Sequence, residues 1–320
     1  MSQPLPTSLP APVNPGRAAA RGLRDRFQSL IFLAPALIVL GIFLVYPAYY
    51  TIRLSFYTSD IFDRFTGYVG LDNFKQLFTN DPEFLDLSHF PPSGELVNNL
   101  KWIVLYISLT LLLGLGLAVL TIRVRYESAV KSLVFVPMAI SATAVAIIWL
   151  LVYSPNPNIG VINAVGTSLG ANPVSWLGQP NTVNYALIFA YVWASTGFAM
   201  VVLSAALKGI PTEIIEAARV DGAGEWYIFR RIMVPMLSLP IAVVFVWLFV
   251  NVIKVFDIIY VMTSGGPGTS SQVIAGRMYT ETFHGGVVGY GAAIAVVMLL
   301  LTLPVMILNV RRFRSARVIT

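Results

Sequence analysis

Long apolar stretches alternate with short polar connections along most of this 320-residue chain. A membrane-spanning helix needs about 20 mostly apolar residues to cross roughly 30 Å of hydrocarbon. Six stretches meet that length and contain no charged residue: 27–52, 102–122, 132–153, 182–207, 232–253 and 285–310. Their apolar residues continue around every helical face, which is typical of helices that contact lipid and one another. The pattern therefore predicts an all-α membrane protein with six transmembrane helices.

Composition narrows the chemistry. Charged residues make up only 11% of the chain and its mean hydropathy is +0.75, whereas a soluble domain has about a quarter of its residues charged. The absence of cysteine excludes disulfides, thiolate nucleophiles and cysteine metal sites. His89 and His284 lie far apart without a second ligand at helical spacing, so we expect no metal.

Lysine and arginine predict the orientation, because they gather in the cytoplasmic connections of membrane proteins. With the N-terminus inside, 15 basic residues fall on the cytoplasmic side and six outside, so both termini are predicted to be cytoplasmic. The basic residues behind the net charge of +6 are thus distributed as in a membrane protein, and they do not indicate binding of nucleic acid. The basic residues before the first span also resemble a secretion signal, but its Ala34-Pro35-Ala36 lies too early for cleavage, so we predict a retained anchor.

The spans divide the chain into predicted regions. Residues 1–26 form a proline-rich disordered tail, 27–52 the first transmembrane helix, 53–101 an acidic external loop, 102–310 the main transmembrane core, and 311–320 a basic tail. In the external loop, "GLDNFKQLF" is predicted to be a short helix capped by Asp72. This loop is either a solvated connection or a landing surface for an external protein. In the uncharged connection 154–181, residues 161–169 are predicted to form a short surface helix.

The segment 254–284 combines polar groups with irregular backbone near the membrane. Asn251, Lys254 and Asp257 recur at intervals of three, and Lys254 and Asp257 are expected to be close enough to pair on one face. Such groups are tolerated near the membrane where they line water or are buried in protein. The alternatives are the exit of a helix to the surface or a polar wall on a solute path. Trp193, Ser195 and Thr196 place polar groups within the fourth span. Hydroxyls often bond back to their own helix, so this interpretation is favoured over a role in lining the path.

The segment 208–235 is polar and lies between two spans. Pro211 suits the first turn of a helix, acidic Glu213 and Glu216 favour its N-terminal end, and Gly222 can end it. Ile214, Ala217, Ala218 and Asp221 fall on one narrow face, which lets another surface approach closely. We therefore predict a docking helix for a partner. No lysine follows a glycine, so the chain lacks a phosphate-binding loop and its energy must come from elsewhere.

Two motifs carry a family resemblance. Glu216-Ala217-Ala218, then Gly222, Ile232 and Pro235, match the EAA motif of binding-protein-dependent ABC importer permeases, with Val234 where leucine is usual, and Asp221 and Ala223 match its extended form. "VFDIIYVMTSGGPGTSS" resembles the corresponding stretch of the carbohydrate-uptake branch. The resemblance covers roughly residues 30–315.

The resemblance implies a type I ABC importer permease fold and a mechanism. Two permease subunits would form the pathway, two cytoplasmic ATPase subunits would bind ATP and Mg²⁺, and an external sugar-binding protein would deliver the solute. This chain would need no cofactor of its own. Glu216 would pair with a basic group on the ATPase, and Gly222 would make the turn after the coupling helix. The first span would wrap the partner permease, in the cytoplasmic (inner) membrane of a bacterium or archaeon.

Two questions stay open at this level. An ion-coupled secondary transporter is the alternative function, although no span contains a carboxylate, and a membrane enzyme is less favoured because no catalytic cluster occurs. The resemblance favours an oligosaccharide, with an α-glucoside as the narrower interpretation. Sugar sites combine aromatic platforms with amides, so the substrate-path candidates are Trp247, Asn251, Lys254, Asp257 and Tyr260.

Overall fold

The computed structural model describes residues 31–59, 65–88, 90–122 and 124–317. The chain divides after Arg53 into two compact units. The predicted disordered tail 1–26 and residues 27–30 of the first predicted span lie outside the described residues.

The described part of the first unit, from residue 31, is an apolar helix. Residues Ile31–Leu54 are long and apolar enough to cross a membrane. The helix contains a wider turn, η1 (Gly41–Val45), followed by α2 (Tyr46–Leu54). Ala34-Pro35-Ala36 lies within helical backbone.

Three long helices form the frame of the second unit: α4 (Glu95–Thr121), α8 (Val183–Lys208) and α15 (Val288–Arg317). Each contains a stretch long and apolar enough to span a membrane. The prediction placed the start of the second span at residue 102, but α4 begins seven residues earlier. Residues 95–101 were assigned to the external loop but are helical. The charged residues Glu95 and Lys101 limit the apolar stretch, but they do not end the helix.

The other two predicted spans are bent pairs of helices and not the continuous helices that hydropathy suggested. The first pair joins Glu127–Ala139 to Ala142–Val152 at 101°, and the second joins Glu225–Met236 to Ser238–Ile253 at 68°. Ser141 has extended backbone and its hydroxyl accepts a hydrogen bond from the amide of Ala144, which starts a new helix at that point. The described residues therefore contain four candidate spans, or up to six when each bent pair counts as one.

The elements of these pairs are short. The first pair comprises α5 (Glu127–Phe135), η3 (Val136–Ala139) and α6 (Ala142–Val152). The second comprises α10 (Glu225–Ile228), η4 (Phe229–Met233), α11 (Val234–Met236) and α12 (Ser238–Ile253).

The core lies where α4 packs along α8. A Cβ atom added at Gly114 would lie 2.5 Å from Cβ of Ala199, and one at Gly197 would lie 2.5 Å from the carbonyl oxygen of Val134. These glycines let α4, α8 and the end of α5 approach closely, as small residues do between membrane helices. The largest fully buried side chains here include Trp102 and Tyr106.

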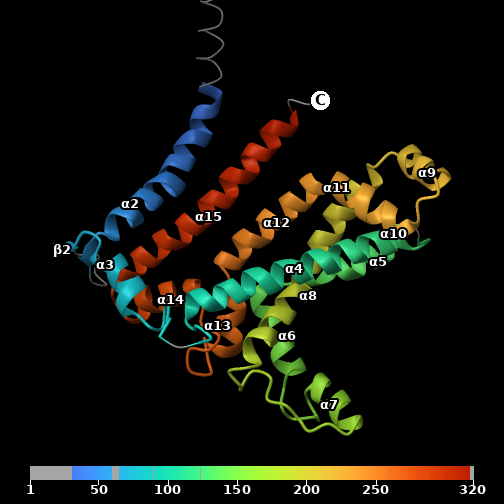
Figure 1. Cartoon of the computed structure of the whole chain (residues 1–320). Helices are drawn as coiled ribbons and strands as arrows, with labels where there is room; N and C mark the ends of the chain where they lie inside the picture. Colours follow the sequence, from blue (N-terminus) through green and yellow to red (C-terminus); the bar gives the residue numbers. More distant parts are fainter. Residues whose placement is uncertain (1–30, 60–64, 89, 123, 318–320) are drawn as a thin grey trace, which may run out of the picture. The chain divides into compact units, whose positions relative to one another are not determined.

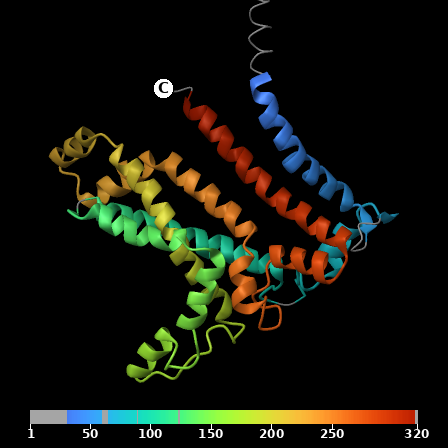
Figure 2. The ribbon, with the colours of Figure 1, turned by 180° about the vertical axis from the view of Figure 1, so that it is seen from behind.

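Short elements connect the long helices. They are β1 (Tyr57–Ser59) and β2 (Phe65–Tyr68), which pair antiparallel, α3 (Asp72–Lys75), η2 (Gln76–Asn80), α7 (Val161–Ser168), α9 (Thr212–Val220), α13 (Asp257–Thr263), α14 (Ile274–Tyr279) and η5 (Thr280–His284). The helix predicted in "GLDNFKQLF" is confirmed, but its cap is wrong. Asp72 is the first helical residue, and Leu71 occupies the cap position without a side-chain hydrogen bond. Figures 1 and 2 show α9 and α10 at the end of the second unit opposite to α14.

Candidate coupling and translocation sites

The predicted docking helix is α9, and a specific turn ends it. The amide of Ala223 donates to the carbonyl of Ala218 at 2.9 Å, and that of Gly222 donates to the carbonyl of Arg219 at 3.0 Å. This pair of bonds is the Schellman motif, which requires a left-handed residue after the helix. Gly222 supplies it with φ of +84°. The turn predicted at Gly222 is present for this reason.

Part of the predicted motif is exposed on α9 and on the turn that follows it. Glu216, Ala217 and Asp221 are exposed, whereas Ala218 is half-buried. Ile215 packs against the core cluster from the opposite side. The structure also exposes apolar residues that the sequence analysis missed: Val220 is 88% exposed, Trp226 70% and Tyr227 58%. The sequence feature that could have identified these residues is their apolar character in an otherwise polar connection.

An ion pair joins α9 to α10. Nε of Arg219 lies 2.8 Å from Oε1 of Glu225. The hydrogen bond to Glu225 raises the pKa of the Arg219 guanidinium, and the nearby charge of Glu216 adds to the effect. The two short helices therefore form one local unit around the Gly222 turn.

A cavity of about 880 Å³ separates α9 and α10 from the ends of α4, α5 and α8. Glu216 and Arg219 line it from one side, and Glu127 lines it from the other. Glu127 also forms ion pairs with Lys131 and, at 2.9 Å, with Lys208. Because Lys208 ends α8 just before α9, this contact links the start of the docking segment to α5.

Four of the five predicted substrate-path residues line two neighbouring cavities. One cavity of about 190 Å³ includes Trp247, and another of about 370 Å³ includes Asn251, Lys254 and Asp257. Both share Ala142, Tyr191 and Ile258 in their walls. The ring of Trp247 packs 4.2 Å from that of Phe198, and the Asn251 amide donates to the carbonyl of Trp247 at 2.8 Å.

The remaining expectations about this region need correction. Lys254 and Asp257 do not share one helical face, because α12 ends at Ile253 and α13 begins at Asp257. No ion pair joins these two described residues, although both face the same cavity. Tyr260 lies apart, beside a separate space of about 30 Å³.

The sequence analysis missed the tyrosines of this region. Tyr191 is shared by both cavities, and its ring centroid lies 4.9 Å from that of Tyr106. The Tyr106 hydroxyl donates to Oγ of Ser195 at 2.9 Å. Thr196 bonds back to the carbonyl of Val192, as expected for a hydroxyl in a helix, whereas Ser195 takes part in this contact between α4 and α8.

The irregular loop after α13 is held by buried amides. The Asn98 side chain donates to the carbonyls of Ser270 and Gln272 at 3.0 and 2.9 Å, and the Asn184 side chain donates to Ser270 at 2.7 Å. Oδ1 of Asn99 accepts from the amide of Ile274 at 2.8 Å. The irregular backbone is therefore satisfied by protein groups, which is the condition expected near a membrane.

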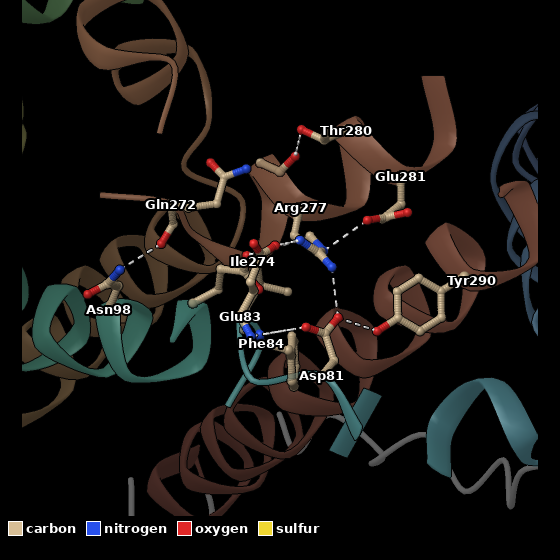
Figure 3. Close-up of polar contacts among 12 residues, drawn as sticks. Asp81, Glu83, Phe84, Asn98, Gln272, Ile274, Arg277, Thr280, Glu281 and Tyr290 are labelled. Carbon is tan, nitrogen blue, oxygen red and sulfur yellow. Dashed lines mark hydrogen bonds and ion pairs between the residues drawn. The ribbon is translucent and has the colours of Figure 1, made fainter. Parts of the chain in front are cut away.

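Three of the seven acidic residues in the predicted external loop, Asp81, Glu83 and Glu95, lie around one arginine. Arg277 of α14 lies 2.8 Å from Asp81 and 3.1 Å from Glu281, and it also pairs with Glu83 (Figure 3). Its Nη1 is 3.9 Å from Oε1 of Glu95, which is 1% exposed. Burial lowers the pKa of Arg277, but the surrounding carboxylates raise it further, so the guanidinium stays charged.

This arrangement changes the interpretation of the loop. Tyr290 of α15 donates to Asp81 at 2.6 Å, so the cluster joins the loop to α4, α14 and α15. Several of the acids that suggested a landing surface are thus used to hold the fold together.

The fold and these sites define a class. Within the described residues no group of three or more His, Cys, Asp or Glu could hold a metal ion. The second unit is an apolar helical bundle with two cavities lined in part by polar groups, and it presents the exposed helix α9 at one end. This arrangement fits a membrane permease that takes its energy from a partner protein.

The chain belongs to the family described as "Binding-protein-dependent transport system inner membrane component", which matches residues 110–317. It is an inner membrane permease subunit of an ABC importer. Permeases of this family work with an ATPase and a binding protein, and the ATP is bound by the ATPase. The family resemblance drawn from the sequence is confirmed.

Relatives cover almost the whole chain. The osmoprotective compounds uptake permease protein GgtC of Synechocystis is 44% identical over 89% of this chain and 98% of its own length. The alpha-glucoside transport system permease protein AglF of Rhizobium meliloti is 41% identical over 92% and 86%. A solved bacterial ABC transporter involved in the import of the acidic polysaccharide alginate has a chain that is 26% identical, with a TM-score of 0.70 over 92% of this chain and 99% of that chain. This likeness confirms the type I importer permease fold.

Proposed function

We propose that this chain forms half of the translocation pathway for a sugar and is coupled to a cytoplasmic ATPase through residues 208–235. The second half would come from a different permease subunit, and two ATP-binding subunits would complete the complex. Both termini would be cytoplasmic, with 53–101 outside, 102–310 as the core and 311–320 as a basic tail. The membrane would be the inner membrane of a bacterium or archaeon.

The observation that carries the coupling role is the rigid exposed helix α9. Its motif residues Glu216 and Ala217 are exposed, and the Gly222 turn sets the angle to α10. A helix that bears two alanines can enter a shallow cleft of a partner. Closure of the ATPase dimer would then move α9 and, through the short connection at 209–211, the end of α8.

The substrate assignment rests on the cavities and on the relatives. Aromatic rings such as Trp247 and Tyr191, together with the Asn251 amide, offer the stacking surfaces and hydrogen bonds that sugars need. AglF is named for alpha-glucosides and the alginate importer moves a polysaccharide. An oligosaccharide is therefore the proposed substrate class, with an α-glucoside as the narrower proposal.

The test is uptake of labelled sugars by the reconstituted importer, with its binding protein and ATPase. Trp247→Ala and Asn251→Ala are expected to lower uptake or change the sugar preference while the complex still assembles. Trp193→Ala is the matched control, since Trp193 lines neither cavity. Unchanged transport and preference in both cavity variants would remove the substrate assignment. Uptake that proceeds without nucleotide would instead favour an ion-coupled secondary transporter and overturn the coupling role.

A further inference from the structure

The short helix α7 has an apolar stripe that no described part of the chain covers. Val161 and Val165 are 59% and 56% exposed, and Leu169, which follows the helix, is 82% exposed. These positions are four residues apart, so they lie on one face. Scattered apolar residues are normal on surfaces, but an aligned stripe marks an interaction.

The stripe is held in a fixed orientation from behind. Asn163 is 3% exposed, and its amide donates to the carbonyls of Ser154 and Val174 at 2.8 and 2.9 Å. Its Oδ1 accepts from the amide of Val174 at 2.9 Å. Ile162 packs against the core cluster. These contacts hold α7 against the segments that precede and follow it in the connection. The apolar face therefore points away from the chain and cannot turn inward.

The surroundings of α7 indicate what covers the stripe. The connection 154–181 contains no charged residue in 28 positions. The spans on either side also expose apolar side chains: Ile147 and Leu151 of α6, and Phe189 of α8. Figures 1 and 2 both show α7 beyond the end of α6, with no other described helix alongside it. The stripe therefore lies in an uncharged connection between two spans with exposed apolar side chains, and this composition favours the bilayer surface over a charged protein partner.

We propose that α7 is an interfacial helix, with Val161, Val165 and Leu169 inserted at the boundary between lipid tails and headgroups. Helices of this kind bury an apolar face at the bilayer surface. Most of them carry basic residues that bind anionic lipid, but α7 carries none. Its attachment is driven by apolar burial, so it does not depend on lipid charge. The contact would stabilise the connection between α6, the second helix of a bent pair, and the long helix α8.

The chain suits a direct test because it has no native cysteine. Single variants Val161→Cys, Val165→Cys and Leu169→Cys receive a spin label in the assembled importer in lipid nanodiscs. Asn158→Cys and Asn172→Cys are matched controls, since both positions are exposed and lie in the same connection but outside α7. Collision rates are measured with oxygen, which concentrates in lipid, and with a nickel chelate, which stays in water.

The stripe positions are expected to be at least several-fold more accessible to oxygen than to the chelate, and the controls the reverse. The same result is expected in phosphatidylcholine alone and with added phosphatidylglycerol. Equal chelate access at stripe and control positions overturns the proposal. So does shielding of the stripe that appears only when the binding protein is added, because that result assigns the stripe to a protein partner. The inference rests on the insertion of α6 and α8 and not on the coupling role of α9, so each can fail without the other.

Discussion

Gly222 offers a way to separate the shape of the coupling segment from its surface chemistry. Its φ is +84°, yet an added Cβ would meet nothing within 4 Å. A substitution there costs backbone strain but no steric clash within this chain. Three variants distinguish the possible effects: Gly222→Ala tests the strain, Gly222→Asn tests an amide that tolerates the left-handed region, and Gly222→Asp adds a charge to nearly the same shape.

The expected magnitudes differ clearly. A non-glycine residue in the left-handed conformation costs about 1–2 kcal/mol, while asparagine and aspartate visit it more readily. Gly222→Ala should therefore shift the turn away from its native form by roughly 5- to 30-fold. Gly222→Asp places a carboxylate beside Asp221 in a surface that the ATPase is proposed to cover. An unpaired buried charge costs about 3–5 kcal/mol, which corresponds to a loss of at least about a hundredfold in affinity.

The assay is the reconstituted importer, with binding of the ATPase, ATP hydrolysis and sugar uptake measured on the same samples. Insertion of each variant into the membrane is checked first. The expected order of uptake is wild type close to Gly222→Asn, then Gly222→Ala, with Gly222→Asp inactive. The Ala variant should keep ATPase binding better than the Asp variant.

Normal uptake in Gly222→Asp would refute the coupling role of this turn. Equal losses in Gly222→Asn and Gly222→Asp would refute the argument from charge and leave shape as the cause. An Ala variant more damaging than the Asp variant would show that backbone strain, and not burial of a charge, dominates.

Three further predictions concern the stability of the fold. Gly197→Ala forces a Cβ to within 2.5 Å of the Val134 carbonyl oxygen, so thermal unfolding should show a loss of stability of about 1–3 kcal/mol. Gly116→Ala is the control, since its Cβ meets nothing within 4 Å. Equal melting temperatures of the two variants would contradict this packing. Arg277→Met leaves the buried carboxylate of Asp81 without its cation and should lower stability by about 3–5 kcal/mol. Adding Asp81→Asn should recover part of the loss, and no recovery would mean that Asp81 is not the group left uncompensated. Asn98→Ala should speed hydrogen exchange in the loop 264–273, because the loss of buried hydrogen bonds costs about 1–3 kcal/mol. The exposed control Asn172→Ala should leave this exchange unchanged. Unchanged exchange in Asn98→Ala as well would show that the Asn98 amide does not hold the loop.

The positions of the membrane segments along the chain were largely predictable from the sequence. Transfer from water to hydrocarbon depends on each residue and its near neighbours, so apolar stretches located the segments that became α4, α8 and α15. The bends within 132–153 and 232–253 were not predictable in this way. Hydropathy averages over a window, whereas the 101° bend depends on local capping at Ser141 and on the packing of Gly197 against the end of α5.

The two candidate sites also differed in how far they could be predicted from local sequence. The coupling segment is local, because its helix, its Schellman turn and its exposed motif all depend on residues within about a dozen positions, and sequence spacing was sufficient to predict them. The cavity walls combine α6, α8 and α12, so Tyr191 gave no local signal and was missed.

Long-range charge pairing was also decided only by the folded chain. Seven acidic residues in 53–101 suggested a surface, but Asp81, Glu83 and Glu95 meet Arg277 from almost 200 residues away along the chain. Lys254 and Asp257, three residues apart, do not pair because the backbone changes direction between them. Sequence alone determined which segments are long and apolar enough to span a membrane and where the predicted docking helix ends, since those properties follow from local transfer energies and backbone conformation. Tertiary structure decided which distant side chains share a cavity or a charge, since that depends on how the helices pack.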